Sequence, residues 1–222
     1  MDHSASVGTL CVVTESTSRL RHSVRRLAFA AAGVVALCAL YLIRPESSGL
    51  VLPEALRPVA EPVIQAIDVT TVLAAAVVLA IVAAMRKLSY GMGAVLLLCI
   101  GANLTSAAVR AWESDAPSVL LPSGHVVAVT ALYGSALLVS APRFRPVIAG
   151  LGFAVVLGVA GAAALVESTG IFGLAASLII FAIWWALAST LMLYSPVAAE
   201  REERRPDTAA IAFSRHRGSL RL

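Results

Sequence analysis

The residues best suited to chemistry stand together in one short stretch, Pro122-Ser123-Gly124-His125, which leads directly into an apolar segment. Pro122 restricts the backbone before that segment, and serine is a preferred residue at the N-terminal cap of a helix. Gly124 lets a ligand approach the backbone closely, and the N–H groups of a helix N-terminus favour an anion such as phosphate. His125 would lie within one turn of that anion, where an imidazole can donate a proton to a leaving oxygen. The stretch therefore predicts either a phosphate site or a helix cap without a ligand.

Three further ionisable residues stand in or beside apolar segments, namely Asp68, Arg110 and Glu167. Charged groups are costly in a bilayer, which makes each of them a candidate for a functional site. Long charged side chains that reach toward the membrane surface produce the same pattern. We expect Asp68 to cap a helix or lie at the interface. Glu167 is either a solvated loop residue or a carboxylate nucleophile or general base.

The elements that must position these residues follow from composition. Of the 222 residues, 59% are hydrophobic and 14% are charged, whereas soluble domains are about 45–50% apolar and about 25% charged. Each apolar segment is close to the ~17–25 residues that cross a bilayer as a helix, and none alternates as a membrane β-strand does. The sequence thus predicts an all-α integral membrane protein, a bundle of six transmembrane helices. The predicted spans are residues 27–43, 63–85, 90–108, 123–141, 147–166 and 171–193.

The distribution of basic residues predicts the orientation. All of the 17 Lys and Arg residues except Arg44, Arg57 and Arg110 lie in the two tails or in the loops after the second and fourth predicted spans. The positive-inside rule then places the tails 1–26 and 196–222 in the cytoplasm, with a membrane domain at 27–195 between them. We expect a multi-pass protein of the cell membrane whose loops 44–62, 109–122 and 167–170 face outward. Anionic lipid of the inner leaflet accounts for the basic residues, so the net charge of +4 does not indicate nucleic acid.

The sequence PSGH at the outer start of the fourth span resembles the second motif of the type-2 phosphatidic acid phosphatase superfamily. The run GANLT at 101–105 is similar to the actinobacterial branch of that superfamily, and the resemblance covers about residues 60–195. The resemblance implies a core of six spanning helices and a lipid phosphate or isoprenoid phosphate as the ligand. It also implies that Ser123 and Gly124 bind the phosphate and that His125 protonates the leaving group. We expect no metal ion or other cofactor.

The first motif of the superfamily, a lysine followed after six residues by Arg-Pro, is altered here. In one register Arg110 replaces the lysine, and Ala116-Pro117 replaces Arg-Pro after a one-residue deletion. In the other register Asn103 replaces the lysine, and Arg110 is the arginine. In both registers Arg110 supplies a cation for the phosphate.

The third motif, which holds the nucleophilic histidine of the superfamily, is altered further. Residues 126–211 contain no histidine, and the nucleophile falls at Glu167 or at Phe172. The aspartate that orients it falls at Ile171 or at Ala176. Without an attacking imidazole the covalent route is lost, although a cradle can still bind phosphate and stabilise charge.

Three functions therefore remain open. The first is a phosphatase-like membrane protein that keeps part of an extracytoplasmic phosphate pocket but is catalytically impaired. The second is an active lipid phosphatase with an unusual nucleophile. The third is a structural or regulatory membrane protein with no ligand.

Overall fold

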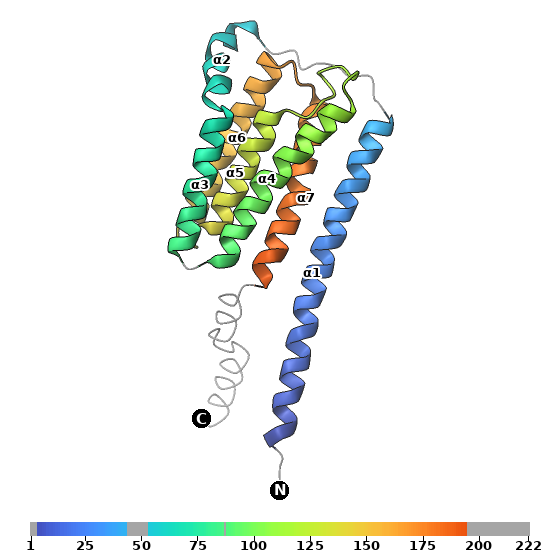
Figure 1. The fold of residues 1–222 in the computed structure, drawn as a ribbon, viewed down its shortest axis with the longest axis vertical. Helices are drawn as coiled ribbons and strands as arrows, with labels where there is room; N and C mark the ends of the chain where they lie inside the picture. The colour runs from blue at the N-terminus through green and yellow to red at the C-terminus, as the bar shows by residue number, and fades with distance from the viewer. Residues whose placement is uncertain (1–3, 44–52, 87, 195–222) are drawn as a thin grey trace, which may run out of the picture.

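The computed structural model describes residues 4–43, 53–86 and 88–194, and all of the regular structure in these ranges is helical (Figure 1). The predicted tail 196–222 and Arg44 lie outside the described residues. Successive helices run up and down the molecule, except for one bent pair that runs in the same direction, so that residues far apart in the sequence meet at each end (Figure 1). They are α1 (Ser4–Ile43), the 3₁₀ turn η1 (Glu54–Leu56), α2 (Arg57–Ala66), α3 (Val69–Met85), α4 (Ser89–Trp112), α5 (Gly124–Val139), α6 (Arg145–Val166) and α7 (Ile171–Leu193).

The lengths of the helices agree with a multi-pass membrane protein. Within the described residues, four helices are long and apolar enough to cross a bilayer: Leu20–Ile43 of α1, Tyr90–Trp112 of α4, α6 and α7. The pair α2 and α3 meets the same test only together, with a bend of 56° between them. Helix α5 is apolar but has only 16 residues. The fold is therefore an all-α membrane protein, and the number of six spans stays a prediction.

Residues 63–85, which the sequence predicts as one span, do not form a single helix. The chain leaves the helical conformation at Ile67, with φ −96° and ψ 58°, and becomes extended at Asp68. The carboxylate of Asp68 accepts a hydrogen bond from Val69 N at 2.7 Å and so caps α3. Aspartate favours such caps over helix interiors because its side chain competes for backbone N–H groups. The cap confirms the expected role of Asp68 and explains the position of the break.

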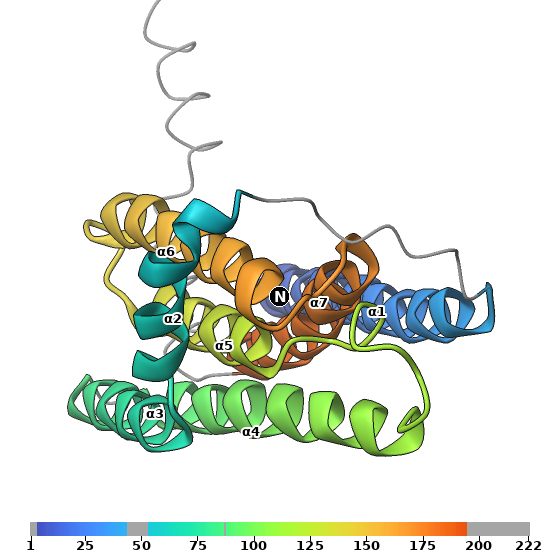
Figure 2. The same cartoon turned by 90° about the horizontal axis from the view of Figure 1, so that it is seen from above.

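Helix α5 lies at the centre of the bundle, with α3, α4, α6 and α7 around it (Figure 2). The largest fully buried side chains of the core include Leu98 of α4, Val127 of α5 and Ile180 of α7. Small residues permit close packing here, because the ring of Trp184 lies directly over Gly101. The Nε1 atom of Trp184 also donates a hydrogen bond to Thr105 Oγ1 at 2.9 Å. The core thus fixes α5, whose first residues are those of the predicted site.

Helix α1 stands at the edge of the bundle, and its main partner is α7 (Figure 2). Polar contacts join the two helices near the lower end, where the Arg26 guanidinium donates to Ser189 O and Tyr194 OH donates to Ser23 Oγ at 3.2 Å. Most apolar side chains of α1 after Leu20 are exposed, as expected for a helix that faces lipid.

Candidate functional site

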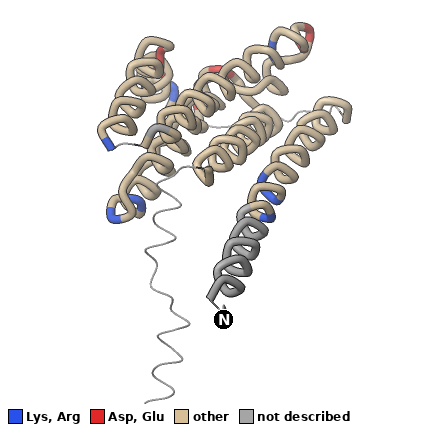
Figure 3. Tube along the Cα trace, turned by 60° about the horizontal axis from the view of Figure 1, so that its bottom comes forward, with Lys and Arg blue, Asp and Glu red and all other residues tan. Residues whose placement is uncertain are grey.

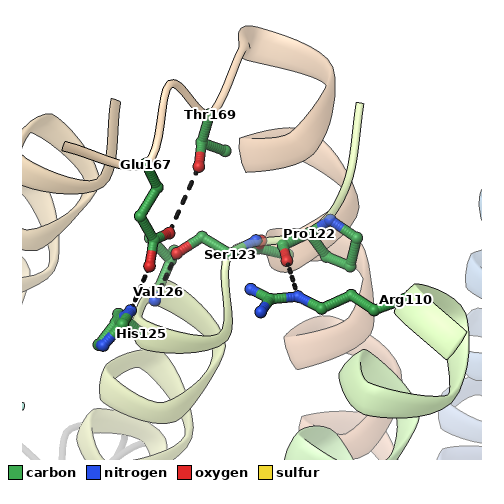
Figure 4. Close-up of polar contacts among 8 residues, drawn as sticks. Arg110, Pro122, Ser123, His125, Val126, Glu167 and Thr169 are labelled. Carbon is green, nitrogen blue, oxygen red and sulfur yellow. Dashed lines mark hydrogen bonds and ion pairs between the residues drawn. The ribbon is translucent and has the colours of Figure 1, made fainter. Parts of the chain in front are cut away.

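The predicted site residues meet at one end of the bundle, where α4 ends, α5 begins and a short loop joins α6 to α7 (Figure 4). Arg110 comes from the last turn of α4, and Gly124 and His125 open α5. Glu167 follows α6 directly as its C-terminal cap residue. The five predicted site residues, Arg110, Ser123, Gly124, His125 and Glu167, therefore lie in one place, whereas Asp68 caps α3.

Ser123 is the N-terminal cap of α5, as the sequence predicts. Its Oγ accepts from Val126 N at 3.3 Å, and its own N–H donates to Ser177 Oγ at 3.0 Å. Ser177 in turn donates to Gly173 O at 2.8 Å, which ties the start of α5 to the first turns of α7. Ser123 and Ser177 are fully buried. Sequence analysis missed Ser177, and the available signal was a hydroxyl within an otherwise apolar segment.

Arg110 lies against the backbone at the start of α5. Its Nε donates to Pro122 O at 2.8 Å (Figure 4). A Cβ placed on Gly124 would stand 3.3 Å from the Nη2 atom of Arg110, so the guanidinium covers the α-carbon of this glycine. Without a side chain at Gly124 the cation lies close over the N-terminus of α5, where the N–H groups point outward, and an added Cβ would displace it by a few tenths of an ångström.

His125 and Glu167 form a pair. The carboxylate of Glu167 can only accept, so the contact between its Oε1 and His125 Nδ1 makes Nδ1 the donor (Figure 4). Thr169, which is buried, donates to the other carboxylate oxygen at 3.4 Å. The two side chains are 31% and 23% exposed, so each is partly shielded from solvent. A carboxylate on Nδ1 orients the ring and presents Nε2 as the nitrogen that can meet a ligand.

A cavity of about 450 Å³ begins at these residues and extends between α3, α4 and α5. Arg110, Gly124 and His125 line its polar end together with Asn103, whose amide donates to Cys99 O at 2.8 Å. Neither Ser123 nor Glu167 is among the lining residues. The remaining lining residues are Ile67, Val69, Val72, Leu73, Ala76, Val77, Leu96, Cys99, Ile100, Leu104 and Ala128, almost all of them apolar.

Of the two positions at which the registers of the third motif place the nucleophile, Glu167 contacts His125. Neither Glu167 nor Phe172 lines the cavity, so the register stays a prediction. The Glu167 position is followed by Ser168 with φ 56°, a conformation that is uncommon for residues other than glycine. This turn brings Thr169 back toward the carboxylate, a contact that sequence analysis missed.

Across the described ranges, no group of three or more His, Cys, Asp or Glu residues is arranged to hold a metal ion. The site offers one guanidinium, one imidazole held by a carboxylate, and a helix N-terminus. Comparison with protein-family models, with curated proteins and with solved structures found no match.

Proposed function

We propose that this chain is a membrane protein that binds a lipid phosphate or isoprenoid phosphate, with little or no catalytic turnover. The observation that carries the proposal is the cavity itself, which has a cation and an imidazole at one end and apolar walls along the rest. An amphipathic ligand with an anionic head and a hydrocarbon chain fits such a lining. The resemblance of PSGH to the type-2 phosphatidic acid phosphatase superfamily supports the same ligand.

The head of the ligand would lie between Arg110, the N-terminus of α5 and Nε2 of His125. Guanidinium groups bind phosphate oxygens through charge-assisted hydrogen bonds, and a helix N-terminus favours negative charge. The hydrocarbon chain would extend between α3 and α4, past the break at Ile67. Leu73, Ile100 and Leu104 on this path are exposed on the helix surfaces, which supports entry of the chain directly from the bilayer.

Weak turnover follows from the groups that line the cavity. Attack of an imidazole on phosphorus forms an N–P bond and breaks the P–O bond to the lipid alcohol, which must then gain a proton. Among the described lining residues, His125 is the one imidazole and there is no carboxyl group. A single histidine cannot act as nucleophile and as proton donor in the same step. Binding is therefore the function that these residues support best.

The His125–Glu167 pair favours a second candidate, an active phosphatase. A carboxylate on Nδ1 raises the ability of Nε2 to attack or to accept a proton, as acid–histidine pairs do in hydrolases. In that case His125, and not Glu167, would be the nucleophile or base, and the leaving alcohol would take its proton from water. Glu167 would act as a positioning residue.

Binding of phosphatidic acid and of a polyprenyl phosphate to the purified protein in neutral nanodiscs tests the proposal. The uncharged diacylglycerol and polyprenol serve as ligand controls. Arg110→Ala should weaken binding about tenfold or more, because one charge-assisted contact contributes about 1.5–3 kcal/mol. The matched variant is Arg57→Ala, since Arg57 lies at the same end but pairs with Glu61 at 3.2 Å. Equal affinities for all three proteins would contradict the proposal and favour a protein without a ligand.

Release of phosphate in the same samples separates the two candidates. Turnover that falls on His125→Ala, with a phosphohistidine trapped at His125, would establish the active phosphatase. Binding without release would leave the first proposal standing.

A further inference from the structure

A second, larger cavity of about 900 Å³ lies at the opposite end of the bundle from the site described above. It is open on one side and lined by residues of α1, α5, α6 and α7, four helices that do not all pack on one another. Helix α1 packs mainly on α7 and therefore leaves a gap toward α5 and α6 near its lower end.

The polar lining of this cavity is basic. Arg25 and Arg26 come from α1, and Arg145 comes from the first turn of α6, so cations from two sides meet in one space. The Arg26 guanidinium donates to Ser189 O, which fixes its position at the end of α7, whereas Arg25 and Arg145 are exposed. Of the described residues, no Asp or Glu lines the cavity. The described walls of the cavity therefore carry a net positive charge.

The rest of the lining is apolar and aromatic. Phe29 of α1, Leu137 of α5 and Trp185 of α7 are among the lining side chains. Phe29 is exposed and lies within the part of α1 that is long and apolar enough to cross a bilayer. Space beside such a helix is filled by hydrocarbon, because water in contact with apolar walls at membrane depth is unfavourable.

We infer that this cavity binds an anionic phospholipid, with the phosphate among Arg25, Arg26 and Arg145 and an acyl chain along Phe29, Leu137 and Trp185. Basic pockets between membrane helices bind anionic headgroups through the same combination of cations and apolar walls. The lipid occupies the gap and links α1 to α5 and α6, which α1 hardly contacts otherwise. The inference does not depend on the phosphate site at the other end.

Matched pairs of arginines make the test specific. Arg21 lies one turn before Arg25 on α1, and Arg143 lies two residues before Arg145, yet neither lines the cavity. Arg143 instead stacks on Phe144, 4.6 Å from the ring centroid. The double variants Arg25→Gln/Arg145→Gln and Arg21→Gln/Arg143→Gln therefore lose the same charge at the same end, and only the first alters the cavity.

The measurement is retention of phosphatidylglycerol against phosphatidylcholine by the full chain in neutral detergent, read by native mass spectrometry. The unmodified protein should prefer phosphatidylglycerol, and Arg25→Gln/Arg145→Gln should reduce its apparent affinity about tenfold. The control pair should stay within about twofold. Arg25→Lys/Arg145→Lys keeps the charge and should restore most of the binding. Equal losses in the two Gln variants, or no preference for the anionic lipid, would overturn the inference, since a diffuse attraction to basic residues would then be sufficient.

A second measurement places the acyl chain. Phosphatidylglycerol with brominated acyl chains should quench the tryptophan fluorescence of the unmodified protein more than brominated phosphatidylcholine does. Trp185→Phe should remove most of this difference, because Trp112 lies at the other end of the bundle and Trp184 packs on Gly101 of α4 without lining the cavity. An unchanged difference in Trp185→Phe would show that the lipid lies elsewhere and would overturn the inference.

Discussion

At the scale of residues, the contact between Glu167 and His125 changes what each can do. The two residues are 42 positions apart, and the carboxylate has one oxygen on His125 and the other on Thr169. Because both of its oxygens already accept hydrogen bonds, this carboxylate is poorly placed to attack phosphorus. The geometry therefore favours Glu167 as a residue that positions His125 over the expected role as nucleophile or base. The imidazole, with Nδ1 committed, keeps Nε2 for a ligand.

A double-mutant cycle measures this pair. Glu167→Ala and His125→Ala should each destabilise the protein, and the double variant should cost less than the sum by about 1 kcal/mol. The physical reason is that each single variant leaves the other partner without its hydrogen bond in a partly shielded place. Unfolding in mixed micelles with increasing denaturing detergent gives the free energies. Additive effects would show that the pair contributes no coupling.

Gly124 provides a test of how closely Arg110 must approach α5. Gly124→Ala places a Cβ 3.3 Å from the guanidinium, which must then move away by a few tenths of an ångström. We expect a several-fold loss of lipid-phosphate affinity with little loss of stability, and a larger loss for Gly124→Val. The control is Gly150→Ala on α6, where an added Cβ meets nothing within 4 Å. The same affinity in all of these variants would contradict a role for this approach.

At the scale of elements, close contacts between α4, α5 and α7 hold the start of α5 in place. A Cβ on Gly101 would lie 2.4 Å from the ring of Trp184, and one on Gly134 would lie 2.7 Å from Phe181. The glycines thus set the distance between these helices. The buried hydrogen bond from Ser123 N to Ser177 Oγ fixes the register of α5 against α7.

Gly101→Ala should therefore destabilise the bundle by about 1–3 kcal/mol, because Trp184 must shift within a packed core. Gly158→Ala on α6 meets nothing within 4 Å and should be neutral or slightly stabilising, since alanine favours a helix more than glycine does. Unfolding in mixed micelles compares the two variants directly. Equal effects would show that Trp184 can accommodate a Cβ at residue 101 and that the packing there does not require glycine.

Sequence reasoning predicted the existence of most helices because uninterrupted apolar runs of this length have few alternatives. It missed the break between α2 and α3, since the residues on both sides of Asp68 are apolar and only the aspartate signals a cap. It predicted the cap at Ser123 from local chemistry. It also placed Arg110 and Glu167 on the same side of the membrane, because loops 109–122 and 167–170 are both predicted to face outward. The pairing of Glu167 with His125 and of Ser123 with Ser177 depends on how α5, α6 and α7 pack, which no local pattern contains.

At the scale of the whole molecule, charge is distributed unevenly between the two ends. Among the residues whose side chains the structure describes, the acidic ones gather at the end that holds the site, and the basic residues of α1 and of the opposite loops lie away from it (Figure 3). Arg57 and Arg110 are the described basic residues at the acidic end. This separation agrees with the proposed orientation, in which the site faces outward and the basic end faces the cytoplasm.

Labelling of introduced cysteines in intact cells tests the orientation. In a chain whose native cysteines have been replaced, Ser118→Cys in the loop before α5 should react with an impermeant thiol reagent. Arg143→Cys, at the opposite end, should react only after the cells are permeabilised. Both positions are exposed, so a lack of reaction reports the membrane barrier and not burial. The reverse pattern would place the site in the cytoplasm.

The shortness of α5 has a consequence for the depth of the site. Its 16 residues extend about 24 Å, whereas a hydrocarbon core is about 30 Å thick, and its neighbours α4, α6 and α7 are longer. Ser123 at the start of α5 is bonded to Ser177, six residues into α7, so His125 and the covering guanidinium of Arg110 lie below the outer end of that helix. Hydrophobic mismatch of this kind is relieved by local thinning of the bilayer. Headgroups beside α3 and α4 would then dip toward the cavity, and a phosphate could reach the site without leaving its own leaflet.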